Sequence, residues 1–215
     1  MARSPRRRAP VQSRSRATVA DILAATARLV EREGHESLTI DRIARVAGVG
    51  VGSIYEYFAS KGAIVEALQD QHFARMGDEL LARMQELEEA PVSQLVFEVA
   101  NLMRTSEILN SKLSRQLLAV PWTKRPRAVI ELEERCADIL YRALLRVAPR
   151  ADPASLRIAV FLVVQTVEAL IVSTSQHRPR GLTRHRFTQE LGALVFRYLA
   201  PILNPKNPSD ARIRS

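Results

Sequence analysis

Between Ser37 and Phe58, small, polar and branched residues follow one another in a pattern that suits contact with DNA. Thr39 is a good N-cap for a short helix, and Gly48 breaks the helical pattern where the chain must bend. A second short amphipathic segment follows at once, with Ile54 as its buried branched residue. Two short helices that cross at a tight turn form a helix-turn-helix, whose second helix fits the major groove. The pattern therefore predicts a DNA-binding segment.

The second of these helices, expected from about Gly50 to Tyr55, would present small side chains to the groove. Val51 can contact a thymine methyl group, and Ser53 can bond a base edge or a phosphate. The helix has no Arg, Asn or Gln for a bidentate base contact, so we expect DNA shape and minor-groove arginines to supply much of the specificity. The candidate DNA contacts, several of them to phosphates, are Arg14, Arg16, Thr39, Gly50, Val51, Gly52, Ser53, Tyr55, Tyr57 and Lys61.

Some of these residues have an alternative role in packing or solubility. One of Tyr55 and Tyr57 could instead brace the core of the small domain, and Phe58 is expected in that core. The net charge is +9, and residues 1–16 hold six arginines and no acidic residue. This basic arm either reaches a minor groove or is a disordered solubilising tail, and DNA contact is favoured for Arg14 and Arg16 because they adjoin the first helix.

The elements that must position these residues are all helices. Apolar residues recur at helical spacing, no alternating strand pattern is present, and the fold class is all-α. Helices are expected from Thr18 to Gly34, through the two short segments, from Ser60 to Pro91, from Ser93, over 111–120 and 127–147, from 154 to about 175, and from 183 to about 200, where Pro201 ends the pattern.

Composition excludes several classes of protein. The single cysteine excludes an internal disulfide and a thiolate metal cluster. The longest apolar run, residues 158–172, is interrupted by polar residues and falls short of a membrane span, and no apolar stretch follows the basic start, as a signal peptide would require. The four histidines are scattered and no phosphate-binding glycine loop follows a strand, so we expect no enzyme, metal or cofactor and a cytoplasmic location.

One set of residues resembles the TetR family of bacterial transcriptional regulators. The matching positions are Ile22, Ala25, Thr26, Leu29, Gly34, Leu38, Thr39, Ile43, Ala44, Ala47, Gly48, Val49, Gly52, Tyr55, Tyr57, Phe58 and Lys61. The resemblance implies an N-terminal three-helix DNA-binding domain, a helical C-terminal domain, a dimer formed by the last two long helices, and a small ligand that releases the protein from its operator. Gly50 and Gly62 depart from the family pattern, which often has a capping residue at the first position and a glutamate at the second.

The predicted domains are a disordered basic arm over 1–16, a helix-turn-helix domain over 17–62, a helical ligand-binding and dimerisation domain over 63–204, and a flexible tail over 205–215. The last two long helices are too apolar for one neighbour to cover, which suits a four-helix bundle shared by two subunits, although a monomer could bury both. The expected interface residues are Val160, Val163, Val167, Leu170, Leu191, Leu194, Val195 and Tyr198.

The ligand pocket is expected around Gln165 and Glu168, which occupy adjoining positions on an otherwise apolar helix. Glu168 could take a cationic ligand, or the pair could instead form a polar interface edge or a salt bridge to an arginine. Candidate apolar walls are Phe97, Met103, Trp122 and Tyr141.

The sequence therefore predicts a homodimeric, ligand-responsive transcriptional regulator, with a repressor released from a palindromic double-stranded DNA operator by an unknown small-molecule effector as the favoured form. The helix from Ser60 would link both domains and transmit the signal. The alternative is an architectural nucleoid-type protein that binds DNA with little sequence preference and senses no ligand.

Overall fold

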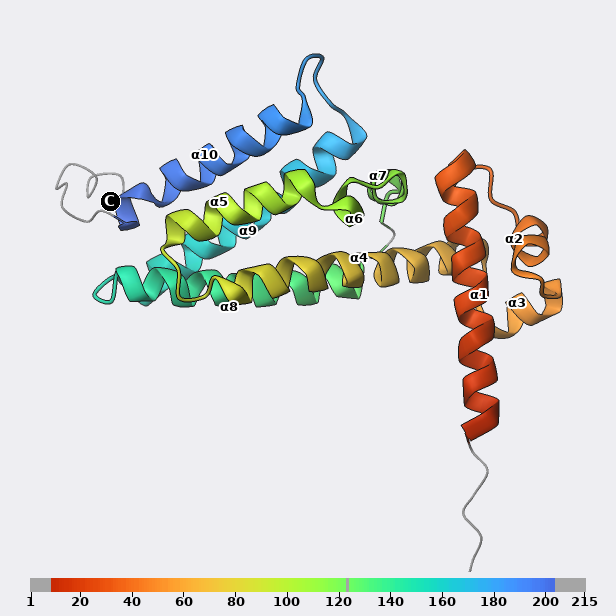
Figure 1. Ribbon diagram of the computed structural model, residues 1–215. Coiled ribbons are helices and arrows are strands. Elements are labelled where there is room, and N and C mark those ends of the chain that lie inside the picture. The colour runs from red at the N-terminus through yellow and green to blue at the C-terminus, as the bar shows by residue number, and fades with distance from the viewer. Residues whose placement is uncertain (1–8, 123, 204–215) are drawn as a thin grey trace, which may run out of the picture. The chain divides into compact units, whose positions relative to one another are not determined.

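A computed structural model describes residues 9–122 and 124–203 of the chain (Figure 1). These residues form helices and contain no strand, which confirms the all-α fold. The chain divides into two compact units, with the boundary between Gln71 and His72. The boundary lies later than the predicted residue 62, because the first turns of a long helix contribute buried side chains to the first unit.

The first unit is a small three-helix domain to which a fourth helix is attached. Its elements are α1 (Ala9–Glu33), α2 (Ile40–Ala47), α3 (Val51–Tyr57) and the start of α4 (Lys61–Glu86). Aliphatic side chains from all four helices form a core without solvent exposure, namely Ile22, Ala25, Val30, Ile43, Ile54 and Ile64. The Ser60 hydroxyl caps α4 by accepting the Ala63 amide at 3.1 Å.

Helix α1 begins at Ala9, earlier than the predicted start at Thr18. The Thr18 hydroxyl donates to the Arg14 carbonyl oxygen at 3.0 Å, so it bonds back within the helix instead of capping it. Residues 9–16 are therefore helical, which corrects the expectation of disorder over that part of the arm. The remaining residues of the arm, 1–8, and of the tail, 205–215, lie outside the described residues.

The second unit contains the rest of α4 and the remaining helices of the described chain. These are α5 (Val92–Thr105), α6 (Glu107–Asn110), α7 (Lys112–Ala119), α8 (Arg127–Val147), α9 (Pro153–Gln176) and α10 (Arg184–Leu203). Helix α5 packs against α10, and α9 packs against α7 and α8 (Figure 1). Most bounds match the prediction, but α6 was not predicted, and α10 continues through Pro201 because a proline in the last turn removes only one amide donor.

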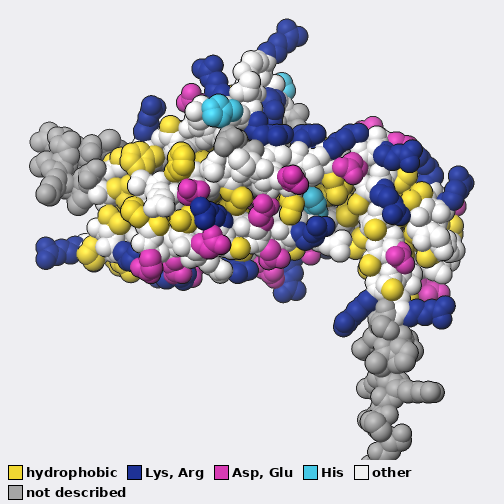
Figure 2. Space-filling model, viewed as in Figure 1, with side chains coloured by type: hydrophobic (Ala, Val, Ile, Leu, Met, Phe, Trp, Pro, Cys, Tyr) yellow, Lys and Arg dark blue, Asp and Glu magenta, His cyan; other side chains and the backbone are white. Residues whose placement is uncertain are grey.

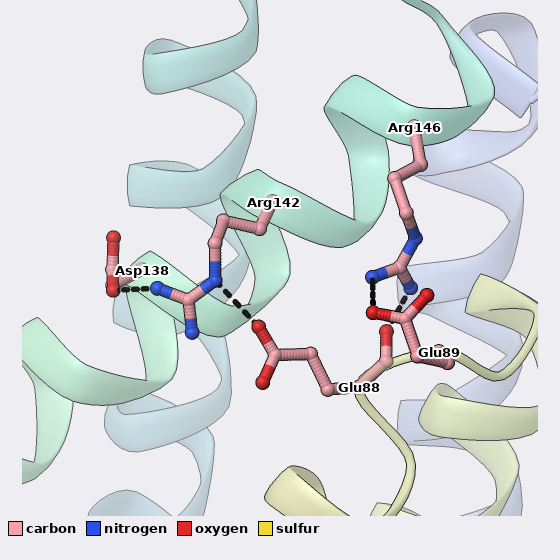
Figure 3. Close-up of polar contacts among 5 residues, drawn as sticks. All are labelled: Glu88, Glu89, Asp138, Arg142 and Arg146. Atoms are coloured by element: carbon pink, nitrogen blue, oxygen red, sulfur yellow. Dashed lines mark hydrogen bonds and ion pairs between the residues drawn. The ribbon is translucent and has the colours of Figure 1, made fainter.

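Hydrogen bonds and ion pairs join the connection between α4 and α5 to the surface of α8 (Figure 3). Arg142 Nε donates to Glu88 Oε1 at 2.6 Å, and the same guanidinium pairs with Asp138. One helical turn further on, Arg146 donates to the Glu88 carbonyl oxygen and pairs with Glu89. These groups are largely exposed, so each pair adds little stability, but together they fix the position of the turn.

Candidate functional sites

The helix-turn-helix of the first unit has the local geometry that its sequence predicts. The Thr39 hydroxyl accepts the Arg42 amide at 3.3 Å and caps α2. Gly48 ends α2 in the left-handed conformation, with φ of 70°, which a residue with a side chain rarely adopts. Gly50 precedes α3 in an extended conformation and supplies no side-chain cap, so α3 is held mainly by Ile54, which is completely buried.

The outer face of α3 is free for contact with another molecule. Val51, Tyr55 and Tyr57 are all exposed, and a side chain added at Gly52 would meet no atom within 4 Å. Neither tyrosine is in the core, so the alternative that one of them braces it is wrong. Phe58 is buried, as predicted.

Three of the predicted DNA contacts come together in a hollow between α1 and α3. Arg14, Ser53 and Tyr57 line it, and the Tyr57 hydroxyl donates to Ser15 Oγ at 3.4 Å. Ser15, Thr18, Val49 and Glu56 complete the lining, and the sequence pattern did not indicate them as part of a site. The other seven predicted contacts do not line this hollow, and all of them are exposed: Arg16, Thr39, Gly50, Val51, Gly52, Tyr55 and Lys61.

The second unit encloses a cavity of about 610 Å³. Its wall is mainly aliphatic, with contributions from α4, α5, α8, α9 and α10. From α4 come Phe73, Met76, Leu80 and Met84. A cavity of this size with an apolar wall and few polar groups is typical of a small-molecule site.

Two carboxylates on the cavity wall are held together by an arginine outside it. Arg125 Nη2 lies 2.5 Å from Glu168 Oε2 and also pairs with Glu133. Burial, followed by the hydrogen bond to Glu168, raises the pKa of Glu133 to about 7. Burial alone would raise the pKa of Glu168 as well, but hydrogen bonds from Arg125 and Glu133 lower it below its usual range. Glu168 therefore stays ionised and already has a cationic partner, which is the salt bridge that the sequence left open as an alternative.

Three further arginines line the cavity from α7, the α9–α10 connection and α10: Arg115, Arg178 and Arg184. Arg184 is half-buried, and the other two are exposed, which places this group where the cavity meets solvent. Burial lowers the pKa of Arg184, and repulsion by Arg115 and Arg178 lowers it further. The sequence pattern did not connect Arg115 with the other two, because it lies far from them along the chain.

Trp122 also lines the cavity, and its ring packs edge-on against Phe73 with centroids 5.9 Å apart. Its Nε1 atom is buried and has no hydrogen-bond partner among the described residues. Because a buried N–H group without an acceptor is costly, this atom is suited to donate to a bound molecule.

The predicted pocket residues are divided by the structure. Met103, Trp122 and Glu168 line the cavity. Gln165 and Tyr141 are half-buried outside its wall, and Tyr141 packs beneath the guanidinium of Arg157 at 5.6 Å. Phe97 is 67% exposed and is not part of the cavity.

Half of the predicted interface residues belong to the interior of the second unit. Val160, Val163, Leu191 and Val195 are buried, and all of these except Val160 line the cavity together with Val167. Leu194 and Tyr198 are exposed, and Leu170 is half-buried. The apolar side chains that face outward from α9 and α10 are Ile158, Phe161, Leu162, Leu194, Phe196 and Tyr198.

Helix α9 is apolar on more than one side. Its segment Pro153–Thr174 has a mean hydropathy of 1.9 and is long enough to cross a membrane, which corrects the expectation that no run reaches that length. A single helix of this kind is weak evidence for a membrane segment, because core helices meet the same criterion. Only 22% of its most apolar window is buried, so an apolar face remains uncovered.

Among the described residues, no three His, Cys, Asp or Glu side chains gather as metal ligands. His72 is buried, and its Nε2 lies 2.5 Å from Ser114 Oγ. Burial raises the pKa of the Cys136 thiol to about 12, which keeps it protonated and unreactive.

Comparisons with known proteins agree with this arrangement. Residues 22–68 match the sequence model of bacterial regulatory proteins of the tetR family, and residues 109–199 match that of the tetracyclin repressor-like C-terminal domain. No curated protein sequence matches the chain significantly.

Solved structures share the fold at low sequence identity. A TetR-family transcriptional regulator from Streptomyces coelicolor is 20% identical, with a TM-score of 0.59 over 88% of this chain and 99% of that one. NalD, the secondary repressor of the MexAB-OprM multidrug efflux pump in Pseudomonas aeruginosa, is 22% identical, with a TM-score of 0.52 over 86% and 96%. A protein of Mesorhizobium loti MAFF303099 is 18% identical, with a TM-score of 0.61 over 87% and 97%.

Proposed function

The chain belongs to the TetR family of bacterial regulatory proteins, and we propose that it is a cytoplasmic, homodimeric transcriptional repressor. A small-molecule effector would bind in the cavity of the second unit and release the protein from a palindromic DNA operator. The observation that carries the proposal is the presence, in one chain, of an exposed helix-turn-helix and an apolar cavity of about 610 Å³.

DNA recognition would rest on α3 and the basic residues around it. The exposed side chains of Val51 and Tyr55, together with the bare backbone at Gly52, allow α3 to approach the groove closely. Arg14 and Ser53 share the hollow between α1 and α3, and would place a phosphate there. Because most of these contacts are to the sugar-phosphate backbone of the DNA, we expect the affinity for DNA to fall steeply as salt is added.

Dimerisation would bury the uncovered faces of α9 and α10. Phe161 is 61% exposed on α9, and Leu194 and Tyr198 are exposed on α10. Exposed apolar residues on two long neighbouring helices suit a four-helix bundle shared by two copies of the chain. A two-fold dimer would present two α3 helices about one DNA turn apart, which requires a roughly palindromic operator.

Helix α4 offers a route from the effector to the DNA. Its first turns place Ile64, Val65 and Leu68 in the core of the first unit, and its later residues, such as Phe73 and Met76, line the cavity. An effector that presses on the cavity side of α4 would therefore displace the helix that anchors the DNA-binding domain. That displacement would change the spacing of the two α3 helices and weaken operator binding.

The experiment is selection of bound duplexes from a random pool by the full-length protein at physiological salt. A palindromic motif supports the proposal and supplies an operator for effector screening. Weak binding without any enriched motif, lost as salt rises, would instead support the architectural alternative. Light scattering checks the dimer: Phe161→Glu should give monomers, whereas Phe97→Glu, an equally exposed phenylalanine on α5, should not.

A further inference from the structure

The cavity wall carries two kinds of polar group: acids that are paired with an arginine, and donors that have no acidic partner among the described residues. Glu133 and Glu168 are the acids on the wall, and both are paired with Arg125. A ligand that approached them as a cation would have to compete with a guanidinium already in place. The acids therefore leave little attraction for a positive charge.

The arginines at the mouth of the cavity have no such compensation. Among the described residues, no ion pair joins Arg115, Arg178 or Arg184 to an acid. Arg115 Nη1 donates to the Asn110 carbonyl oxygen at 2.6 Å. Burial lowers the pKa of the half-buried Arg184, the nearby charges of Arg115 and Arg178 lower it further, and an anion placed among the three would offset that repulsion.

A buried donor on the wall favours an acceptor as well. Trp122 Nε1 is a donor only, and it is buried without a partner among the described residues. The lining hydroxyls of Thr174 and Thr188 donate to backbone carbonyls within their own helices, so neither has a free proton for a ligand. Apart from these groups the wall is mainly aliphatic. The cavity thus offers apolar surface along its length and positive charge at its opening.

We infer that the effector is an amphipathic anion, with its apolar body in the cavity and its carboxylate or phosphate head among Arg115, Arg178 and Arg184. The inference rests on the proposed function, and names the chemical class of ligand for that site. Guanidinium groups bind both kinds of anionic head through charge-assisted, bidentate hydrogen bonds. Figure 2 shows Lys and Arg side chains concentrated over the connection between α9 and α10, so the positive charge extends beyond the mouth.

The test compares ligands that share one tail and differ only in the head group. Dodecanoate, dodecyl phosphate, dodecanol and dodecyltrimethylammonium are titrated, below their micellar concentrations, into the full-length protein. Because the chain has one tryptophan and Trp122 lines the cavity, its fluorescence reports occupancy directly. The anions should bind about tenfold or more tightly than the alcohol, as expected for one added charge-assisted contact, and the ammonium should bind most weakly. The two anions separate carboxylate from phosphate recognition.

Variants locate the head group. Arg184→Gln should remove most of the preference for the anion and leave dodecanol binding unchanged, and Arg184→Lys should restore part of it. Arg178→Gln tests the same group at an exposed position where folding is not at risk. The matched control is Arg197→Gln, an exposed arginine of α10 that does not line the cavity. Equal binding of all head groups, a preference for the ammonium, or an anion preference that survives both Arg184→Gln and Arg178→Gln would overturn the inference.

Operator release is measured separately, with the selected DNA. Anion binding with the predicted preference supports the ligand class even if operator affinity does not change, in which case the proposed release mechanism fails. Conversely, release by a cationic or neutral compound, with no anion bound, would uphold the regulator and overturn the ligand class.

Discussion

The two units of the chain use their apolar side chains differently. In the first unit, aliphatic residues of α1 to α4 fill the interior, and six of them have no exposed surface. In the second unit, residues of similar type surround a cavity of about 610 Å³. A filled core holds α3 in one position, as recognition of DNA requires, whereas a cavity gives up packing energy to leave room for another molecule. The recognition surface therefore depends on a rigid core, and the ligand site depends on incomplete packing.

The largest predicted effect comes from truncating one isoleucine in each unit to alanine. Ile54→Ala leaves a void in the filled core and should lower the free energy of unfolding by about 2–5 kcal/mol. Ile171→Ala, at the half-exposed cavity wall, should cost much less, because that side chain already borders empty space. Urea unfolding followed by circular dichroism measures both, and Trp122 fluorescence follows the second unit alone. Equal losses would show that the cavity is packed in solution.

Enlarging a side chain, instead of removing one, tests the same difference in packing between the two units. Ala25→Phe forces a ring into the filled core and should cost about 1–3 kcal/mol or more, with loss of DNA binding. Val167→Phe directs its ring toward the cavity and should leave thermal stability equal or higher. The same variant should no longer bind dodecanoate, since the space for the tail is occupied. Destabilisation of both variants to a similar extent would contradict the comparison.

A smaller effect is expected on the surface of α3, where one substitution should raise stability and weaken operator binding. Gly52→Ala should stabilise the first unit by about 1 kcal/mol, because alanine favours the helix and its methyl group meets no neighbour. The same methyl group should weaken operator binding if the DNA approaches this backbone. Gly62→Ala in the first turn of α4 is the control, with the same gain in helix propensity and no change in DNA affinity. Unaltered operator binding by Gly52→Ala would place the groove contact elsewhere.

The sequence predicted the first unit well because its determinants are local. The cap at Thr39, the left-handed turn at Gly48 and the buried Ile54 lie within one short segment, and each acts on its immediate neighbours. The start of α1 was misplaced, since Thr18 can cap a helix or bond back within one, and only the structure distinguishes the two.

The second unit was predicted less well, because helical periodicity does not say what an apolar side chain faces. Val163 and Phe161 are neighbours on α9, yet the first is buried and the second faces outward. Of the three arginines at the cavity mouth, Arg178 and Arg184 lie in or next to the connection between α9 and α10, whereas Arg115 comes from α7. Such non-local juxtapositions leave no pattern along the chain, whereas the α8 boundaries, set by Pro126 and the apolar repeat, were found correctly.

The smallest predicted effect separates the units by their response to acid. His72 Nε2 bonds to Ser114 Oγ, and that hydroxyl donates to the Ile108 carbonyl oxygen at 2.6 Å, so the histidine is the donor and its ring can remain neutral. Burial, with repulsion from Arg75, lowers the pKa of His72 below its usual 6.5. The unfolded chain therefore binds the proton more readily, and stability should be full above pH 6.5 and decline as the pH falls below it.

This decline should appear in the transition reported by Trp122, since both residues belong to the second unit. His72→Gln, which can still donate to Ser114, should remove that part of the slope, while His185→Gln, at an exposed position, should retain it. If His72→Gln unfolds with the wild-type dependence on pH, the histidine has the same pKa in the folded and unfolded chain, and the second unit is more open to water around α7 than its burial indicates. The packing contrast between the two units would then extend beyond the cavity itself.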